Sequence, residues 1–201
     1  MKYNGLILSK RFMKKFILLV LITLPLCGTI FAESEFAGYP IFGYENETGF
    51  YGGGLVYMRN RPKHFDPSIT PNSYYLSLEY SEKKQFLIKF EPKIHLKNGL
   101  YTFGSTLNFK KWPSKFYGIG NNSKLENAED FTPNEFGCTF DIKRKLPKNW
   151  DISLIYDFSH YEITKMEEGG TLILGEIPGS KGGFNSGLGL QIGYDSRNAE
   201  S

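Results

Sequence analysis

Strict alternation between apolar and polar residues is the feature that most constrains the fold of this chain. In residues 150–161 apolar side chains occupy every second position over most of the segment, and Asp151, Ser153 and Asp157 fall between them. A period of two is typical of a β-strand whose two faces meet different surroundings. The pattern recurs along most of the chain, and we find no convincing helical period. The sequence therefore predicts an all-β fold.

The alternating segments predict about seven or eight strands, most of them long enough to cross a bilayer when tilted. Turn residues separate several of them, with the strongest hairpin signal at Asn98-Gly99, because both residues accept positive φ. A long loop is expected over residues 112–133, and all strands can pair as antiparallel hairpins. The expected strands are 49–59, 74–80, 85–95, 100–110, 135–144, 149–161 and 184–195, with a further short one at 171–177.

The first 32 residues have the composition of an export signal. Four Lys and Arg residues between positions 10 and 15 precede an apolar run over residues 16–26. That run suits a signal core and is too short to span a membrane as a helix, and Ala32 offers a cleavage point. An N-terminal membrane anchor is the alternative interpretation. We expect a signal peptide over residues 1–32 and a β domain over residues 33–201.

Charge and cysteine content narrow the possible functions. The sequence has 24 Lys and Arg against 21 Asp and Glu, but five of the cations and none of the acids lie before residue 33, so the remainder has a net charge of −2. No basic excess argues for nucleic acid as a partner. Beyond residue 32 the only cysteine is Cys138, on the apolar face of its strand, where we expect a small hydrophobe rather than a disulfide.

Two architectures fit this pattern. In a soluble barrel or sandwich the apolar face points inward, whereas in a membrane barrel it points outward to lipid. Aromatic residues gather at the ends of several strands, the polar faces are rich in Gly, Ser and Thr, and the strands exceed the usual length of about five or six residues. These features favour an antiparallel transmembrane β-barrel in the outer membrane of a Gram-negative bacterium.

Three segments resemble the BamA/TamA (bacterial surface antigen) family. The segment at residues 39–44, followed by a glycine-rich strand, is similar to the opening of its barrel domain. Phe116, Tyr117, Gly118, Gly120 and Asn121 match a Phe-Tyr-Gly-x-Gly-Asn segment of its short members. The family's Tyr-Asp-Thr-Arg-Asp-Asn segment is matched by residues 194–199 in part, through Tyr194, Asp195 and Arg197, with Ser at position 196 and Asn at position 198.

The resemblance covers most of residues 38–198 and implies an outer-membrane location with a role in membrane-protein assembly or transport, or as a passive surface antigen. The chain differs from the family in two respects. The strands begin too soon after the signal for periplasmic POTRA modules to precede them, and the family barrel has about sixteen strands. We therefore expect residues 33–201 to form the N-terminal part, about half, of a longer barrel.

No catalytic constellation emerges from the residues. Ser159 and His160 are strand neighbours and point to opposite faces, so they cannot form a dyad. The acids Glu126, Glu129 and Asp130 lack the spacing of a calcium loop, and the Gly118-x-Gly120 segment lacks the helix of a phosphate cradle.

Lumenal charges are the remaining polar candidates. We expect Asp195 and Arg197 to form an ion pair near the rim, and Lys89, Glu91 and Lys93 to face charged neighbours across the lumen.

The leading hypothesis is a non-enzymatic outer-membrane barrel that needs no cofactor or metal. We expect outer-membrane lipid as a partner, together with other outer-membrane proteins. The alternative is an exported soluble β-barrel that binds a small apolar ligand in its interior. A weaker third hypothesis is an outer-membrane hydrolase, which would need an active-site pair that the sequence does not offer.

Overall fold

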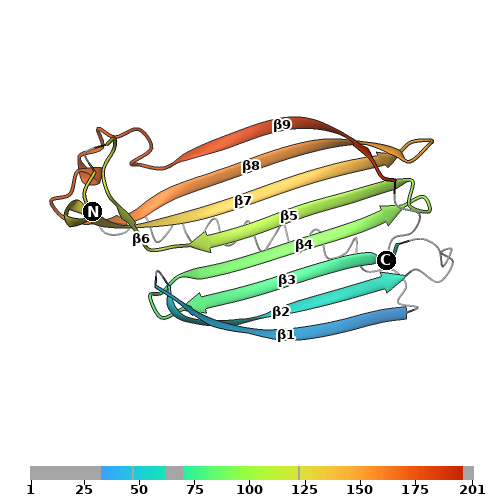
Figure 1. Cartoon of the computed structure of the whole chain (residues 1–201), viewed down its shortest axis with the longest axis horizontal. Helices are drawn as coiled ribbons and strands as arrows, with labels where there is room; N and C mark the ends of the chain where they lie inside the picture. The colour runs from blue at the N-terminus through green and yellow to red at the C-terminus, as the bar shows by residue number, and fades with distance from the viewer. Residues whose placement is uncertain (1–32, 47, 62–69, 122, 197–201) are drawn as a thin grey trace.

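The computed structural model describes residues 33–46, 48–61, 70–121 and 123–196, and folds them into one antiparallel sheet of nine strands (Figure 1). The order is β1-β2-β3-β4-β5-β7-β8-β9, with β6 paired to β7 beside this path. The all-β, antiparallel prediction is confirmed, whereas the predicted signal peptide lies outside the described residues. The strands are β1 (Glu33–Glu45), β2 (Gly49–Arg61), β3 (Asn72–Ser81), β4 (Phe86–Leu96), β5 (Tyr101–Lys111), β6 (Ser114–Phe116), β7 (Glu129–Lys145), β8 (Trp150–Met166) and β9 (Gly183–Tyr194).

Tight turns connect most neighbours, as the sequence indicates. Asn98 and Gly99 have φ of 54° and 77° between β4 and β5, and Lys148 and Asn149 have φ of 59° and 62° between β7 and β8. Asparagine and glycine tolerate this left-handed region, so the predicted hairpin residues set these turns. Each turn brings sequential strands together without a crossover.

Three sequence predictions are wrong in detail. The strand count was too low, because β1 and the three-residue β6 were not expected. The segment 171–177 forms a short 3-10 helix, Leu172–Leu174, that ends at Gly175 with φ of 74°. The expected loop over residues 112–133 is interrupted by β6, by a second 3-10 helix at Leu125–Asn127, and by the start of β7 at Glu129.

The pairing register divides the side chains into two faces. Residues such as Phe42, Leu78, Leu107, Ile142 and Leu190 lie on the apolar face, because each is in register with apolar neighbours on the adjacent strands. Positions between them carry the polar side chains and form the polar face. Many large side chains of the apolar face are exposed, among them Phe36, Phe42, Tyr44, Phe50, Leu76, Leu78, Ile142, Leu154, Leu188, Leu190 and Ile192.

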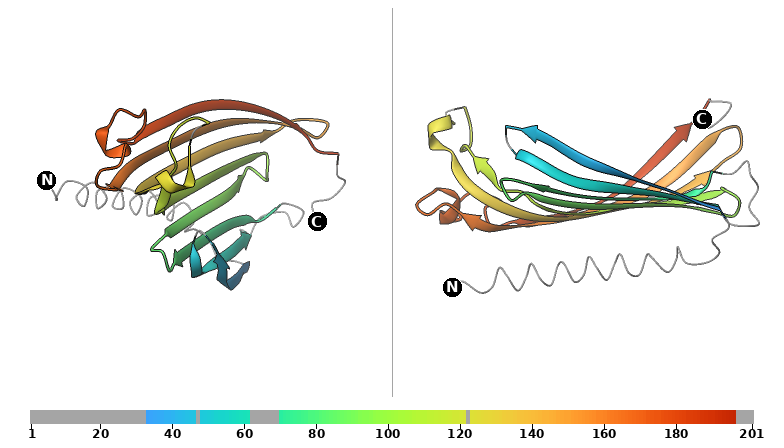
Figure 2. Two further views of the ribbon diagram at one scale, coloured as in Figure 1. Left: turned by 60° about the vertical axis from the view of Figure 1, so that its left-hand side comes forward. Right: turned by 90° about the horizontal axis from the view of Figure 1, so that it is seen from below.

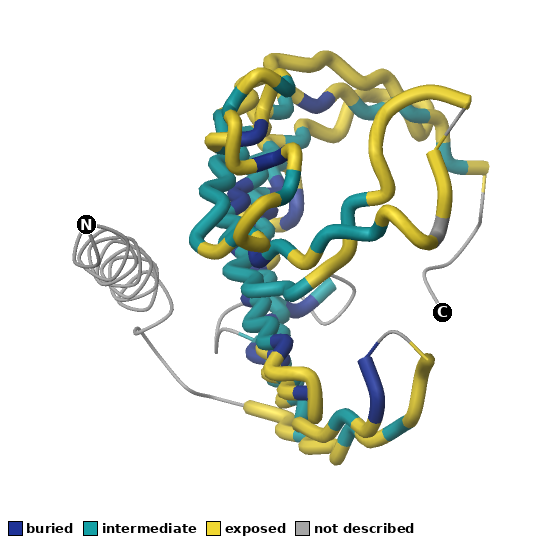
Figure 3. Tube along the Cα trace, turned by 90° about the vertical axis from the view of Figure 1, so that its left-hand side faces the viewer, coloured by how far each residue is buried: buried dark blue, intermediate teal, exposed yellow. Residues whose placement is uncertain are grey.

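The sheet is bent into a trough, with the β1–β2 side and the β8–β9 side rising in the same direction (Figures 2 and 3). The polar face lies inside this trough. An open hollow is lined by polar-face side chains of β2, β3, β4, β5 and β7, and only a concave surface can bring that many adjacent strands around one space. The apolar face is therefore convex.

The middle of the apolar face holds a small cluster of buried residues. Leu107 has no exposed surface, and Phe90 and Cys138 are buried beside it. Cys138 is a free thiol and is in register with Leu107, so the expectation of a small apolar side chain at this position is confirmed. Partly buried aromatic residues such as Phe136 pack against the cluster.

The sheet of the described residues is open. β1 and β9 each pair with a single neighbour, β2 and β8, and they form the two edges. The described residues contain no helix that is long and apolar enough to cross a membrane. Because β1 and β9 are not paired with each other, the described strands do not close into a barrel.

Candidate functional site

The concave polar face carries a continuous set of charged and hydroxyl side chains. Lys89 Nζ lies 2.9 Å from a carboxylate oxygen of Glu91, and Thr106 on the next strand donates a hydrogen bond of 3.3 Å to the same oxygen. Farther across the sheet, Thr139 donates to Asp157 at 2.7 Å. Lys89, Glu91 and Asp157 are thus held by partners within the sheet.

A hollow of about 390 Å³ opens over the same face. Gly104 is part of its wall, and Asp141 leans over the position that a Cβ atom of Gly104 would occupy. Lys93 and the rings of Tyr57 and Tyr75 line the rest of the space together with Glu91 and Thr106. Both charge signs and two phenol groups line this open hollow.

The histidines are not brought together. His95 lies on the concave face, where its Nδ1 shares a hydrogen bond of 3.0 Å with the hydroxyl of Thr102. His160 is in register with Phe136 and Phe184 on the convex face. Ser159 faces the other way and accepts a hydrogen bond of 3.4 Å from Asn185, so the expected separation of Ser159 from His160 is confirmed. His64 lies outside the described residues.

The second family-like segment, Phe116 to Asn121, forms an exposed loop after β6. Phe116 ends that strand in register with Glu129, and Tyr117 and Ile119 are 41% and 71% exposed. Gly118 and Gly120 both have φ of 92°, a conformation that glycine adopts without strain, and a turn of this kind is what their sequence predicts. Asn121 follows in a turn and is exposed.

The third family-like segment lies at the opposite end of the sheet (Figure 1). Tyr194 ends β9, and its ring lies 5.1 Å from that of Trp150 on β8. The backbone N–H of Asp195 donates to the carbonyl of Asn149 at 3.0 Å. Arg197 is outside the described residues, so its predicted ion pair with Asp195 stays a prediction. The structure therefore places the two segments at different ends instead of in one site.

A polar network at the loop end of the sheet was not expected. Glu129 begins β7, and its Oε1 accepts hydrogen bonds from the backbone N–H and the hydroxyl of Thr171 at 2.7 and 2.6 Å. Its Oε2 accepts from the N–H of Leu172 at 3.1 Å. These bonds hold the pKa of Glu129 below its usual range, the hydroxyl of Thr171 contributing most. Glu129 thus fastens the β8–β9 loop to the start of β7.

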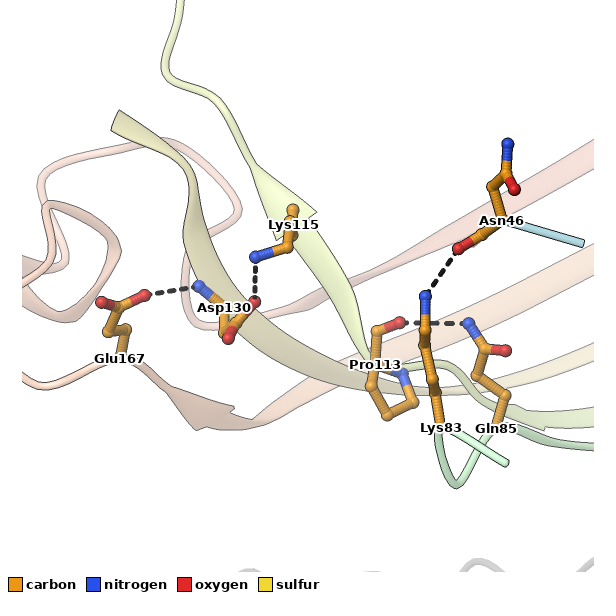
Figure 4. Close-up of polar contacts among 7 residues, drawn as sticks. All are labelled: Asn46, Lys83, Gln85, Pro113, Lys115, Asp130 and Glu167. Carbon is orange, nitrogen blue, oxygen red and sulfur yellow. Dashed lines mark hydrogen bonds and ion pairs between the residues drawn. The ribbon is translucent and has the colours of Figure 1, made fainter. Parts of the chain in front are cut away.

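Further polar contacts lie near this end of the sheet, on β6, at the start of β7 and on the turns after β1 and β3 (Figure 4). Lys115 on β6 pairs with Asp130 at 3.0 Å, which raises the pKa of Lys115, and the N–H of Asp130 donates to Glu167 at 2.7 Å. Lys83 donates to the carbonyl of Asn46 at 2.6 Å. Glu129 and Asp130, two of the three acids considered for a calcium loop, have protein partners instead.

Metal binding finds no support in these contacts. Glu126 pairs with Lys124 at 3.2 Å, on a segment separate from the bonds made by Glu129. Within the described ranges no three His, Cys, Asp or Glu side chains converge in a way that could hold a metal ion. The proximity of Glu129 to Thr171 had no signal in the sequence, since 42 residues separate them.

No family model, no curated protein and no solved structure matches this chain.

Proposed function

We propose that this chain forms part of a bacterial outer-membrane β-barrel of the BamA/TamA type and is not an enzyme. The observation that carries the proposal is the convex face. Large apolar side chains are exposed on both sides of its buried centre, on β1 to β3 and on β7 to β9, with Phe42 at 81% and Leu190 at 76%. Exposed apolar surface of this extent is costly in water and favourable against lipid.

The dimensions and rim residues support the same proposal. The strands β4 and β5 have 11 residues each, which at about 3.3 Å per residue and a tilt near 45° cover about 25 Å, the height of the apolar band of such barrels. Aromatic pairs lie at both ends of the convex face, Tyr44 with Phe50 and Trp150 with Tyr194. Aromatic girdles mark the two interfaces of a bilayer.

Two unpaired edges inside lipid would be unstable, because no water is present to satisfy their backbone groups. The proposal therefore includes further strands that pair with β1 and β9 in the membrane. The polar trough then becomes part of a water-filled lumen. The completed barrel would act in membrane-protein assembly, in transport or as a passive surface antigen.

The alternative, an exported soluble β-barrel with an apolar ligand inside, requires the apolar face to be concave. The large exposed apolar side chains such as Phe42 and Leu190 lie on the convex face instead, and charged residues such as Lys93 and Asp141 lie on the concave face.

Fractionation of cells that express the chain tests the choice. The membrane proposal predicts recovery from outer membranes only with detergent, and a monodisperse periplasmic extract without detergent contradicts it.

A further inference from the structure

Three cations lie together at one end of the sheet, at the two adjacent turns that join β4 to β5 and β7 to β8. The turns are neighbours because Tyr101 is in register with Arg144, and the N–H of Lys145 donates to the carbonyl of Leu100 at 2.9 Å. We name this cluster the basic rim; all three of its side chains are exposed, and its members are Lys97, Arg144 and Lys148. Lys145 follows Arg144 on β7 and faces the concave side, in register with Asp151.

Two members of the basic rim converge on one ring. Lys97 Nζ lies 5.7 Å and Arg144 Cζ 5.9 Å from the centre of the Tyr101 ring. Each contact is favourable by itself, and together they place two positive charges beside one aromatic ring at the end of the sheet. An anionic group near the ring is attracted by both charges, and a phosphate suits the planar guanidinium of Arg144 especially well.

Nearby acids do not neutralise the basic rim. Asp151 lies 3.8 Å from Lys143, a neighbouring cation that is not part of the cluster. In the part of the chain that the structure describes, none of these three cations forms an ion pair within 4 Å.

The position of the cluster identifies the kind of anion. Tyr101 and Arg144 lie on the convex face, and the next apolar residues along it are Leu96 and Ile142, which are 50% and 52% exposed. A ligand held at the ring would therefore extend along an apolar surface. Free phosphate has no apolar part to contact that surface, whereas the acyl chains of a lipid can pack against it.

Resting on the proposed membrane location, we propose that the basic rim binds the phosphate headgroup of an anionic phospholipid, with the acyl chains against Leu96 and Ile142. Cations beside an aromatic belt at the edge of an apolar face are the arrangement by which membrane proteins retain such lipids. The aromatic belt here is the pair of Trp150 on β8, the strand next to Arg144, and Tyr194 on β9 beyond it.

Trp150 serves as a reporter, since it lies in the same hairpin as Lys148 and is 47% exposed. The full chain carrying Trp112→Phe has Trp150 as its single tryptophan. It is folded into phosphatidylcholine vesicles that contain a minor fraction of phosphatidylglycerol, and one of the two lipids is brominated at a time. We expect brominated phosphatidylglycerol to quench Trp150 roughly fivefold more than its mole fraction predicts, the factor that one surface cation supplies.

Two matched controls accompany this measurement. A variant with Trp112→Phe, Trp150→Phe and Tyr44→Trp places the reporter at the other end of the convex face, where Tyr44 is 60% exposed. It should be quenched in proportion to mole fraction. Replacing the three basic-rim cations by Gln should reduce the quenching of Trp150 to that proportion, whereas replacing Lys84, Lys124 and Lys165, exposed cations elsewhere in the chain, should leave it enriched.

The outcomes separate this inference from the proposed function. Quenching of Trp150 by both lipids in proportion to their mole fractions overturns the lipid site and leaves the membrane location intact. Loss of the enrichment in inorganic phosphate, at an ionic strength matched with chloride, assigns the cluster to free phosphate and also overturns it. If neither brominated lipid quenches Trp150, the membrane location fails and the lipid site with it.

Discussion

Glycines on the two faces of the sheet meet different surroundings. On the concave face, neighbouring polar side chains cover the space where a Cβ atom would stand, as Asp141 does over Gly104 and Asn108 over Gly137. On the convex face, the nearest atom to such a Cβ at Gly54 is the carbonyl oxygen of Tyr39, 3.6 Å away. Side chains converge on the inside of a curve, so glycines on that side make room for the bend.

Gly53 is the position where this requirement is strictest. A Cβ atom there would overlap the backbone carbonyl of Leu78 on β3, and it would lie 2.9 Å from the Cα atom of Glu79. The obstacle is backbone, which cannot rotate away as a side chain can. We expect Gly53→Ala to lower the free energy of unfolding by about 1–3 kcal/mol, as overpacking does. Urea unfolding of the protein folded in detergent micelles measures this change.

The neighbouring glycine provides the control. Gly54→Ala adds a methyl group at an ordinary contact distance, on the same strand and with the same loss of unfolded-chain entropy. It should change stability by no more than about 1 kcal/mol, in either direction. Equal losses of unfolding free energy in the two variants would show that the close approach of β2 and β3 at Gly53 does not affect stability.

At the scale of elements, the β8–β9 loop depends on Glu129 for its attachment. Glu129→Ala removes three hydrogen bonds to Thr171 and Leu172. We expect the amide protons of these two residues to exchange roughly tenfold faster, because both backbone bonds are charge-assisted. Glu126→Ala is the control, since its carboxylate pairs with Lys124 at 3.2 Å and makes no bond to that loop. Unchanged exchange in Glu129→Ala would contradict the assigned role.

The pH dependence of the same attachment has a definite sign. The folded-state pKa of Glu129 is lowered from 4.5 by its bonds to Thr171 and Leu172. The stability that these bonds add is therefore fully present above pH 4.5, and it is lost as the pH falls through the lowered pKa. In the wild-type protein, amide exchange of Thr171 corrected for intrinsic rates should stay constant from neutral pH to about 5 and rise below about 4. A rise that is complete above pH 5 would assign the change to another group.

Alternation predicted the elements that have two unlike faces and missed those that do not. β3, β5 and β8 were expected because their apolar residues fall on every second position. β1 was missed because Pro40 and two glycines interrupt its pattern, and an edge strand tolerates proline where a central strand does not. The run at 171–177 is too short for periodicity to separate a strand from a helical turn.

Only those features of the candidate site that depend on residues close together in the sequence were predictable. The turns at Gly118 and Asn98 follow from residue type, and the placement of Ser159 and His160 on opposite faces follows from strand geometry. The bonds of Glu129 to the β8–β9 loop and the contact of Lys97 and Arg144 with one tyrosine depend on strand order and register. No single-sequence pattern encodes contacts between segments that are more than 40 residues apart.

For the whole molecule, the direction of curvature decides which solvent each face meets. Alternation is equally compatible with an apolar interior and an apolar exterior. The hollow lined by Tyr57, Lys93 and Asp141 places the polar face inside the trough. The strand at one edge then offers a direct comparison, since Leu190 and Gln191 are consecutive, both are exposed, and they face opposite sides.

Leu190→Arg places a charge on the convex face near the middle of β9, and Gln191→Arg places the same charge on the concave face one residue farther along. In a bilayer, Arg at mid-depth on the lipid side costs about 2–4 kcal/mol, whereas on the lumen side water solvates it. We expect urea unfolding from phosphatidylcholine vesicles to show that loss for Leu190→Arg and a change below about 1 kcal/mol for Gln191→Arg. In water the exposed Leu190 position would accept Arg without loss, so equal stability of the two variants would place the convex face in solvent instead of lipid.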